Sequence, residues 1–123
     1  MLRILIALLL TLGCSSTYLW AKDNGQWAQV DPKVRDWFNS QKSRSGVHCC
    51  TVADGTYAEQ EERGSSYWTR WRMPDGKMTD WIEVPESAVL YRTASPTGSA
   101  VVWWGANPDG TLMVRCYVPA SQV

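Results

Sequence analysis

The stretch AVVWWGANPDGTLMVRCYV (residues 100–118) decides the fold that the chain is expected to adopt. At its centre, Pro108 presets the backbone for a tight turn, Asp109 fits the next position, and Gly110 accepts the left-handed conformation that closes a three-residue hairpin loop. The flanking segments are rich in β-branched and aromatic residues, which favour strands. The sequence therefore predicts a β-hairpin over roughly 100–118.

Alternation of side chains divides this hairpin into two faces. In the predicted register Trp104 faces Val114 and Val102 faces Cys116, and one face carries no charge. That face is expected to be core and consists of Ala100, Val102, Trp104, Leu112, Val114, Cys116 and Val118.

A second hairpin is predicted because the same turn recurs 34 residues earlier, as Pro74-Asp75-Gly76. Val84-Pro85 likewise recurs as Val118-Pro119 under the same shift. The hairpin should span roughly 67–84. Its expected cross-strand pairs are Met73 with Lys77, Arg70 with Asp80, and Trp68 with Ile82.

The segment before the hairpins contains one helix. Asp31-Pro32 is typical of an N-cap followed by proline at the first helical position, and apolar residues then recur at helical spacing, which predicts a helix over 31–42. Residues 47–53 are a short strand candidate, and the charged residues 58–66 are expected to be a solvated loop. The predicted class is α+β: one short N-terminal helix packed on a small antiparallel sheet, or partly open barrel, built from two hairpins.

The N-terminus is typical of a secretory signal peptide, here assigned to residues 1–21. Two cleavage sites compete: a bacterial lipobox that would lipidate Cys14, and an ordinary signal-peptidase site after Ala21. An uncleaved anchor is a third reading, but the apolar run of about ten residues is short for a hydrocarbon core of about 30 Å. Residues 22–30 would form a tether, and 31–123 a single disulfide-stapled domain.

Export leaves three cysteines, Cys49, Cys50 and Cys116, in an oxidising compartment. We expect Cys116 to pair with Cys49 or Cys50, because adjacent cysteines bridge each other only through a strained ring. The third thiol leaves open a redox couple, an intermolecular bridge or a metal site with His48 and Asp54, although the spacing fits none of these well.

Composition limits the functional classes. Twelve Lys and Arg balance twelve Asp and Glu, so the net charge of +0 gives no basic excess for binding nucleic acid. With one His and no recognisable catalytic or cofactor motif, we expect no cofactor, no metal and no enzymatic activity. The enzymatic alternative is a thiol–imidazole pair of His48 with Cys49 or Cys50, oriented by Asp54, but neighbours on a strand point to opposite faces.

The face opposite the predicted core carries the candidate binding residues, with Trp103 directly across from Arg115 at cation–π distance. Flat rings beside hydrogen-bonding groups suit the apolar faces of sugars or a peptide. The alternative is that the 31–42 helix covers these rings as a second core layer. The set consists of Tyr67, Trp71, Trp81, Trp103, Arg115 and Tyr117.

Three motifs carry a resemblance: Cys49-Cys50-x-x-Ala53-Asp54-Gly55, Trp81-Ile82-x-Val84-Pro85 and Cys116-Tyr117-Val118-Pro119. With them the chain resembles small exported proteins of unknown function from alphaproteobacteria and their phages. The resemblance covers most of the mature chain. It implies export, a bridge from Cys49 or Cys50 to Cys116 and a compact β-rich domain, and it assigns no catalytic residue.

These observations predict a small, exported, non-catalytic cell-envelope protein, periplasmic or held at the outer membrane as a lipoprotein. It would bind a glycan or another envelope partner, polymer or protein, through its aromatic sheet face. The alternative is a structural or inhibitor-like envelope lipoprotein that acts by protein–protein contact.

Overall fold

A computed structural model describes residues 29–49 and 55–121. The helical elements are the α-helix α1 (Pro32–Ser40) and the 3₁₀ helix η1 (Glu86–Ala88). The strands are β1 (Gly55–Arg63), β2 (Ser66–Trp71), β3 (Ile82–Glu83), β4 (Ala100–Ala106) and β5 (Leu112–Val118). The expected signal peptide, with Cys14 and Ala21, lies outside the described residues, as do Cys50 and Asp54. Within the described ranges, no helix is long and apolar enough to cross a membrane.

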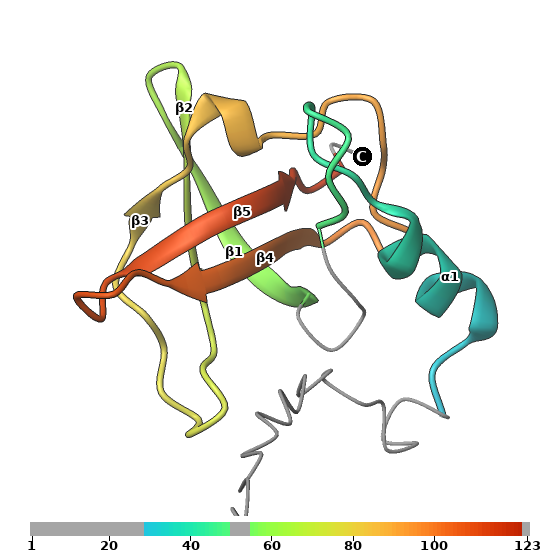
Figure 1. Cartoon of the computed structure of the whole chain (residues 1–123), viewed down its shortest axis with the longest axis horizontal. Helices are drawn as coiled ribbons and strands as arrows, with labels where there is room; N and C mark the ends of the chain where they lie inside the picture. Colours follow the sequence, from blue (N-terminus) through green and yellow to red (C-terminus); the bar gives the residue numbers. More distant parts are fainter. Residues whose placement is uncertain (1–28, 50–54, 122–123) are drawn as a thin grey trace, which may run out of the picture.

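The five strands form one antiparallel sheet in the order β3-β2-β1-β4-β5, curved into a half-barrel (Figure 1). After β3, η1 carries the chain back across the sheet, and Val89 then forms a parallel bridge with Tyr117 of β5. The amide of Leu90 donates to the carbonyl of Tyr117 at 2.8 Å. This crossing segment therefore links the two outermost strands of the sheet.

The predicted α+β class is wrong, because the protein is mostly β, about 14% helical and 41% strand. The main reason is residues 58–66, which form most of β1 and the turn after it instead of a solvated loop. In β1, Glu59, Glu61 and Arg63 are exposed, whereas Ala58 and Gln60 are half-buried. Successive side chains of a strand point to opposite faces, so a strand in the middle of a sheet can carry charged residues on its solvent-exposed face.

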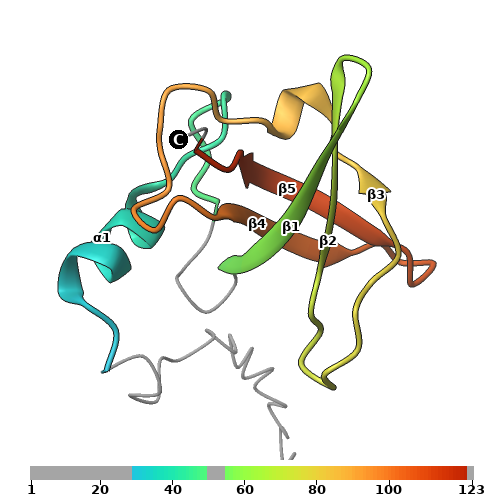
Figure 2. The same ribbon diagram turned by 180° about the vertical axis from the view of Figure 1, so that it is seen from behind.

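Helix α1 confirms the predicted helix within two residues at its end. The carboxylate of Asp31 accepts a hydrogen bond from the amide of Lys33 at 2.8 Å, which satisfies one free donor of the first turn. The inward face of α1 buries Phe38, and Gln41 just beyond the helix is also buried. In both views α1 lies on the opposite side of the molecule from β3 (Figures 1 and 2).

Both Pro-Asp-Gly turns form as predicted. In the second, the amide of Asn107 donates to the carbonyl of Thr111 at 2.7 Å, and Gly110 has a φ of +85°. The first turn repeats this pattern between Met73 and Lys77. A third turn of the same kind spans residues 43–47, although its sequence, Ser-Arg-Ser-Gly-Val, lacks the Pro-Asp pair.

In both hairpins, irregularities at a distance from the turn change the strand pairing from the predicted register. Trp104 pairs with Val114 as predicted, but a bulge between Trp103 and Trp104 places Trp103, not Val102, opposite Cys116. In the first hairpin Trp68 pairs with Glu83 instead of Ile82, also one residue out of the predicted register. The expected ion pair of Arg70 with Asp80 is wrong as well, because the carboxylate that Arg70 contacts is that of Glu59 on β1.

Two apolar clusters form the core, one on each side of β4. The first lies under α1 and the second fills the concave side of the half-barrel. Consequently neighbours on β4 are buried on opposite sides: Val102 in the half-barrel and Trp103 under α1. The predicted division into a core face and an open face therefore does not hold for this strand, because the sheet is covered on both sides.

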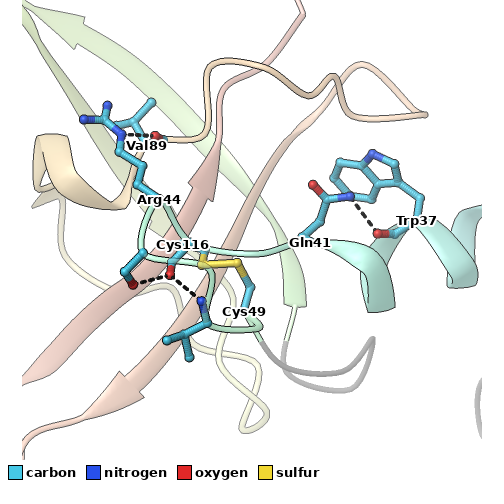
Figure 3. The surroundings of a disulfide bond; sticks show 9 residues. Trp37, Gln41, Arg44, Cys49, Val89 and Cys116 are labelled. Carbon is cyan, nitrogen blue, oxygen red and sulfur yellow. Dashed lines mark hydrogen bonds between the residues drawn. A yellow bond between two sulfur atoms is a disulfide. The ribbon is translucent and has the colours of Figure 1, made fainter.

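The disulfide joins Cys49 to Cys116, 67 residues apart, and both residues are buried in the cluster under α1. This settles the choice that the sequence left between Cys49 and Cys50. The bond ties the hairpin around residues 42–48 to β5 (Figure 3).

Candidate functional site

The structure does not bring the six predicted binding residues to one exposed face. Trp71, Trp103 and Tyr117 have no solvent-exposed surface. Trp71 and Tyr117 lie inside the half-barrel, whereas Trp103 lies under α1. Rings that contact no solvent cannot form a binding platform without rearrangement of the core.

Helix α1 covers Trp103, as the alternative reading of the aromatic face expected. The ring centroids of Trp37 and Phe38 lie 5.9 and 5.6 Å from that of Trp103. The predicted cation–π pair of Trp103 with Arg115 is wrong, because the bulge in the second hairpin places Cys116 opposite Trp103. The Arg115 guanidinium instead passes over Gly105, where a Cβ would lie 3.0 Å from its Nε.

Tyr67 and Trp81, the remaining members of the set, occupy different surfaces. Half-buried Tyr67 packs against Tyr117 at 5.9 Å between ring centroids. Burial, followed by the negative charge of Glu62 and then the neighbouring Tyr91, raises the pKa of Tyr67 above its usual value. Trp81 lies on the outer side of the sheet, next to arginines.

The outer side of β1 and β2 carries an arginine–tryptophan stack that the sequence did not predict. The Arg63 guanidinium lies 4.4 Å from the ring centroid of Trp68 and 5.6 Å from that of Trp81, and Arg70 lies 4.8 Å from Trp81. The arginines also form ion pairs with Glu61 and Glu59. Since the rings contact arginines and the arginines contact carboxylates, this surface is internally satisfied.

A concave site lies between the residues that follow α1 and the segment after η1. We call it the basic cleft. It has a volume of about 520 Å³. Its lining consists of Gln41, Lys42, Ser43, Arg44, Val89, Leu90, Tyr91, Arg92 and Thr93.

Arg44 is held in a fixed position in the basic cleft. Its Nε donates to the carbonyl of Val89 at 3.1 Å, as Figure 3 shows, and its guanidinium lies 5.2 Å from the ring centroid of Tyr91. Val89 is itself fixed by its bridge to Tyr117. The cation is thus oriented by the fold before any ligand arrives, so little side-chain entropy remains to be lost on binding.

The wall of the basic cleft is connected to α1 by side-chain hydrogen bonds. The indole Nε1 of Trp37 donates to Oγ1 of Thr93 at 3.1 Å, which joins the helix to the far wall. On the near wall, Nε2 of Gln41 donates to the carbonyl of Trp37 at 2.8 Å (Figure 3). Both walls are therefore positioned by the packed part of the molecule.

The positive charge of the basic cleft is not paired with any carboxylate of the described residues. Lys42, Arg44 and Arg92 line it, and no acidic residue does. Within the described residues, the ion pairs are those of Arg63 with Glu61 and of Arg70 with Glu59. None of the three cations of the basic cleft therefore forms an ion pair with a described carboxylate. Three adjacent cations around a concave surface create a local positive potential that attracts an anionic group.

The thiol and metal alternatives also involve Cys50 and Asp54, which lie outside the described residues. Cys49 is held in the disulfide and has no free thiol, and His48 is exposed beside Lys42, with which it forms a bridge. No group of three or more His, Cys, Asp or Glu residues in the described ranges could hold a metal ion.

Sequence analysis missed the basic cleft because residues 41–44 and 89–93 share no motif. The signal in the sequence was the run Lys42-Ser43-Arg44, which lies at and just beyond the end of the helix predicted over 31–42. Comparison of the chain with protein-family models, curated proteins and solved structures finds no match.

Proposed function

We propose that the protein is an exported, non-catalytic binding module of the cell envelope and that it recognises an anionic group in the basic cleft. The observation that supports this most directly is the guanidinium of Arg44, held between the Val89 carbonyl and the Tyr91 ring. Beside it are Lys42 and Arg92, which form no ion pair with the described residues. Guanidinium groups bind carboxylates and phosphates with charge-assisted hydrogen bonds, and a preorganised one does so at a smaller entropic cost.

The charge distribution favours a discrete anionic group over a long polyanion. The whole chain has a net charge of +0, so it has no general positive charge, and the positive charge of the basic cleft comes from Lys42, Arg44 and Arg92. Binding to a nucleic acid usually requires a longer track of positive charge. A carboxylate or phosphate on an envelope polymer or envelope protein matches the charge of the site.

Export and envelope attachment are part of the same proposal. They rest on the signal-peptide pattern of residues 1–21, with lipidation of Cys14 or cleavage after Ala21 as the two routes. The Cys49–Cys116 disulfide is compatible with an oxidising compartment.

A sugar-binding platform has less support than the basic cleft. Of the predicted rings, those of Trp71, Trp103 and Tyr117 are fully buried. Trp81 is in contact with Arg63 and Arg70, so a sugar would have to displace them to stack on it. The protein-contact alternative is favoured by Tyr91, which is 61% exposed at the edge of the basic cleft and offers an apolar contact beside the cations.

The experiment is a titration of the oxidised protein with the capped peptide acetyl-Glu-Ala-Ala-Gln-amide, followed by heteronuclear NMR. The double variant K42Q/R92Q should bind the peptide about fivefold to tenfold more weakly than the wild type, because each exposed charge contributes up to about 1 kcal/mol. Neither side chain forms a hydrogen bond, an ion pair or a ring contact with the described residues, so the fold should be unchanged.

The matched control is K33Q/K77Q, which removes the same charge from α1 and from the turn after β2. If the control weakens binding as much as K42Q/R92Q does, general electrostatics explain the attraction and the proposed site is wrong. Equal affinity of the wild type and K42Q/R92Q would also reject it.

A further inference from the structure

A second concave site borders the basic cleft. We call it the acidic pocket; its volume is about 310 Å³. It lies where the start of β2 meets the chain between β3 and η1, and it shares Val89 and Tyr91 with the basic cleft. It is lined by Ser65, Ser66, Tyr67, Glu83, Val84, Pro85, Glu86, Val89 and Tyr91.

The acidic pocket has the opposite charge to its neighbour. Glu83 and Glu86 are exposed on its wall, no cation lines it, and neither glutamate forms an ion pair with the described residues. Two aromatic hydroxyl groups, from Tyr67 and Tyr91, complete a lining suited to an ammonium or guanidinium group.

Tyr91 separates the two sites and is accessible to both. Its side chain is 61% exposed, and Arg44 stacks on its ring. A ligand that extends from one site to the other must pass over this ring, which offers an apolar contact for aliphatic or backbone groups.

We propose that the basic cleft and the acidic pocket act together as a docking surface for a peptide segment of a protein partner that carries an acidic and a basic side chain. The acidic side chain would bind near Arg44 and Arg92, the basic one near Glu83 and Glu86, and the intervening residues would pass over Tyr91. This inference rests on the proposed function and specifies the chemistry of its ligand.

Charge complementarity favours such a segment over a uniformly charged polymer. A polyanion that leaves the basic cleft over Tyr91 meets Glu83 and Glu86, and like charges at short range repel. A polycation meets the opposite obstacle at Lys42, Arg44 and Arg92. A segment with both charges avoids each repulsion and gains both attractions.

The test compares capped peptides on the oxidised, full mature protein. The dipolar probes are acetyl-Glu-Ala-Ala-Lys-amide and its reverse, acetyl-Lys-Ala-Ala-Glu-amide. The singly charged probes are acetyl-Glu-Ala-Ala-Gln-amide and acetyl-Gln-Ala-Ala-Lys-amide, and tripolyphosphate serves as a compact polyanion. At least one dipolar probe should bind about tenfold more tightly than either singly charged probe.

The variant E83Q/E86Q identifies the second site. It should reduce the affinity for the preferred dipolar peptide to that of the acidic peptide, about tenfold, while leaving the acidic peptide's own affinity unchanged or slightly higher. The control D36N/D80N removes two exposed carboxylates elsewhere and should change neither affinity.

The results separate this inference from the proposed function. If dipolar and acidic peptides bind equally, and both weaken in K42Q/R92Q, the basic cleft is an anion site but the dipolar ligand is wrong. The proposal of a dipolar ligand would also be wrong if tripolyphosphate bound more tightly than every peptide and E83Q/E86Q did not change the affinity for any of them. If K42Q/R92Q leaves every affinity unchanged, both proposals fail.

Discussion

Removal of the Cys49–Cys116 disulfide should greatly destabilise the domain. The bond links residues 67 positions apart, and in the chain-entropy model a loop of that length contributes about 4 kcal/mol. For a domain of this size that is a large share of a typical free energy of unfolding of about 5–15 kcal/mol. We therefore expect C49A/C116A to lose about 4 kcal/mol, with a further loss from the buried sulfur atoms that alanine does not replace.

The assay is urea unfolding monitored by tryptophan fluorescence, with no oxidant or reductant added. Cys50 is kept unchanged in both the wild type and the variant. The control is the wild type treated with a reductant, which breaks the bond but keeps both sulfur atoms in the core. Its loss should approach that of the variant. A loss below about 1 kcal/mol in C49A/C116A would refute the assignment of the bond as the main constraint between the 42–48 hairpin and β5.

Three further perturbations test the packing. Gly55→Ala would place a Cβ 2.6 Å from Cδ1 of Phe38 and should cost about 1–3 kcal/mol in urea unfolding. Gly110→Ala should lower stability by about 1 kcal/mol, since its φ of +85° is unfavourable for a residue with a Cβ; a thermal midpoint equal to that of the wild type would contradict this. Burial raises the pKa of Tyr117 to about 12, so its contribution to stability is fully present below the unfolded-state pKa of about 10 and is lost as the pH rises through 12. Tyr117→Phe should flatten the fall in unfolding midpoint between those pH values, and an unchanged slope would refute this role.

Features that depend on neighbouring residues were predictable from the sequence. The Pro-Asp-Gly turns and the Asp31 cap form because a few adjacent residues satisfy local backbone requirements. The disulfide could be reduced to two choices because, once the expected signal peptide is set aside, Cys49 and Cys50 are the possible partners of Cys116 in the sequence.

Features that depend on distant contacts were not predictable. Strand β1 was missed because Gln60, a polar residue, is used inside the fold: its Oε1 accepts hydrogen bonds from the Tyr117 hydroxyl and the Ala120 amide, each at 2.9 Å. The bulge between Trp103 and Trp104 leaves no turn signal in the sequence, yet it moves Cys116 by one position relative to β4. Because of the missed strand β1 and the bulge, the predicted aromatic residues do not lie on one exposed face.

The basic cleft depends on contacts of the same distant kind. Arg44 reaches the Val89 carbonyl because the disulfide fixes the 42–48 hairpin to β5 and because η1 returns the chain to the same strand. Neither segment has a composition that indicates a site. A site that is formed only by tertiary contacts between distant residues can be recognised only from the folded structure.

Recognition of an anionic group in the basic cleft is tested most directly by mapping backbone amide chemical shifts while acetyl-Glu-Ala-Ala-Gln-amide is added. We predict that the largest saturable shifts fall on residues 41–44 and 89–93, with none of comparable size on the arginine–tryptophan stack around Trp68 and Trp81. Shifts concentrated on that stack, or the absence of saturable shifts in residues 41–44 and 89–93, would contradict the assignment of the basic cleft as the binding site.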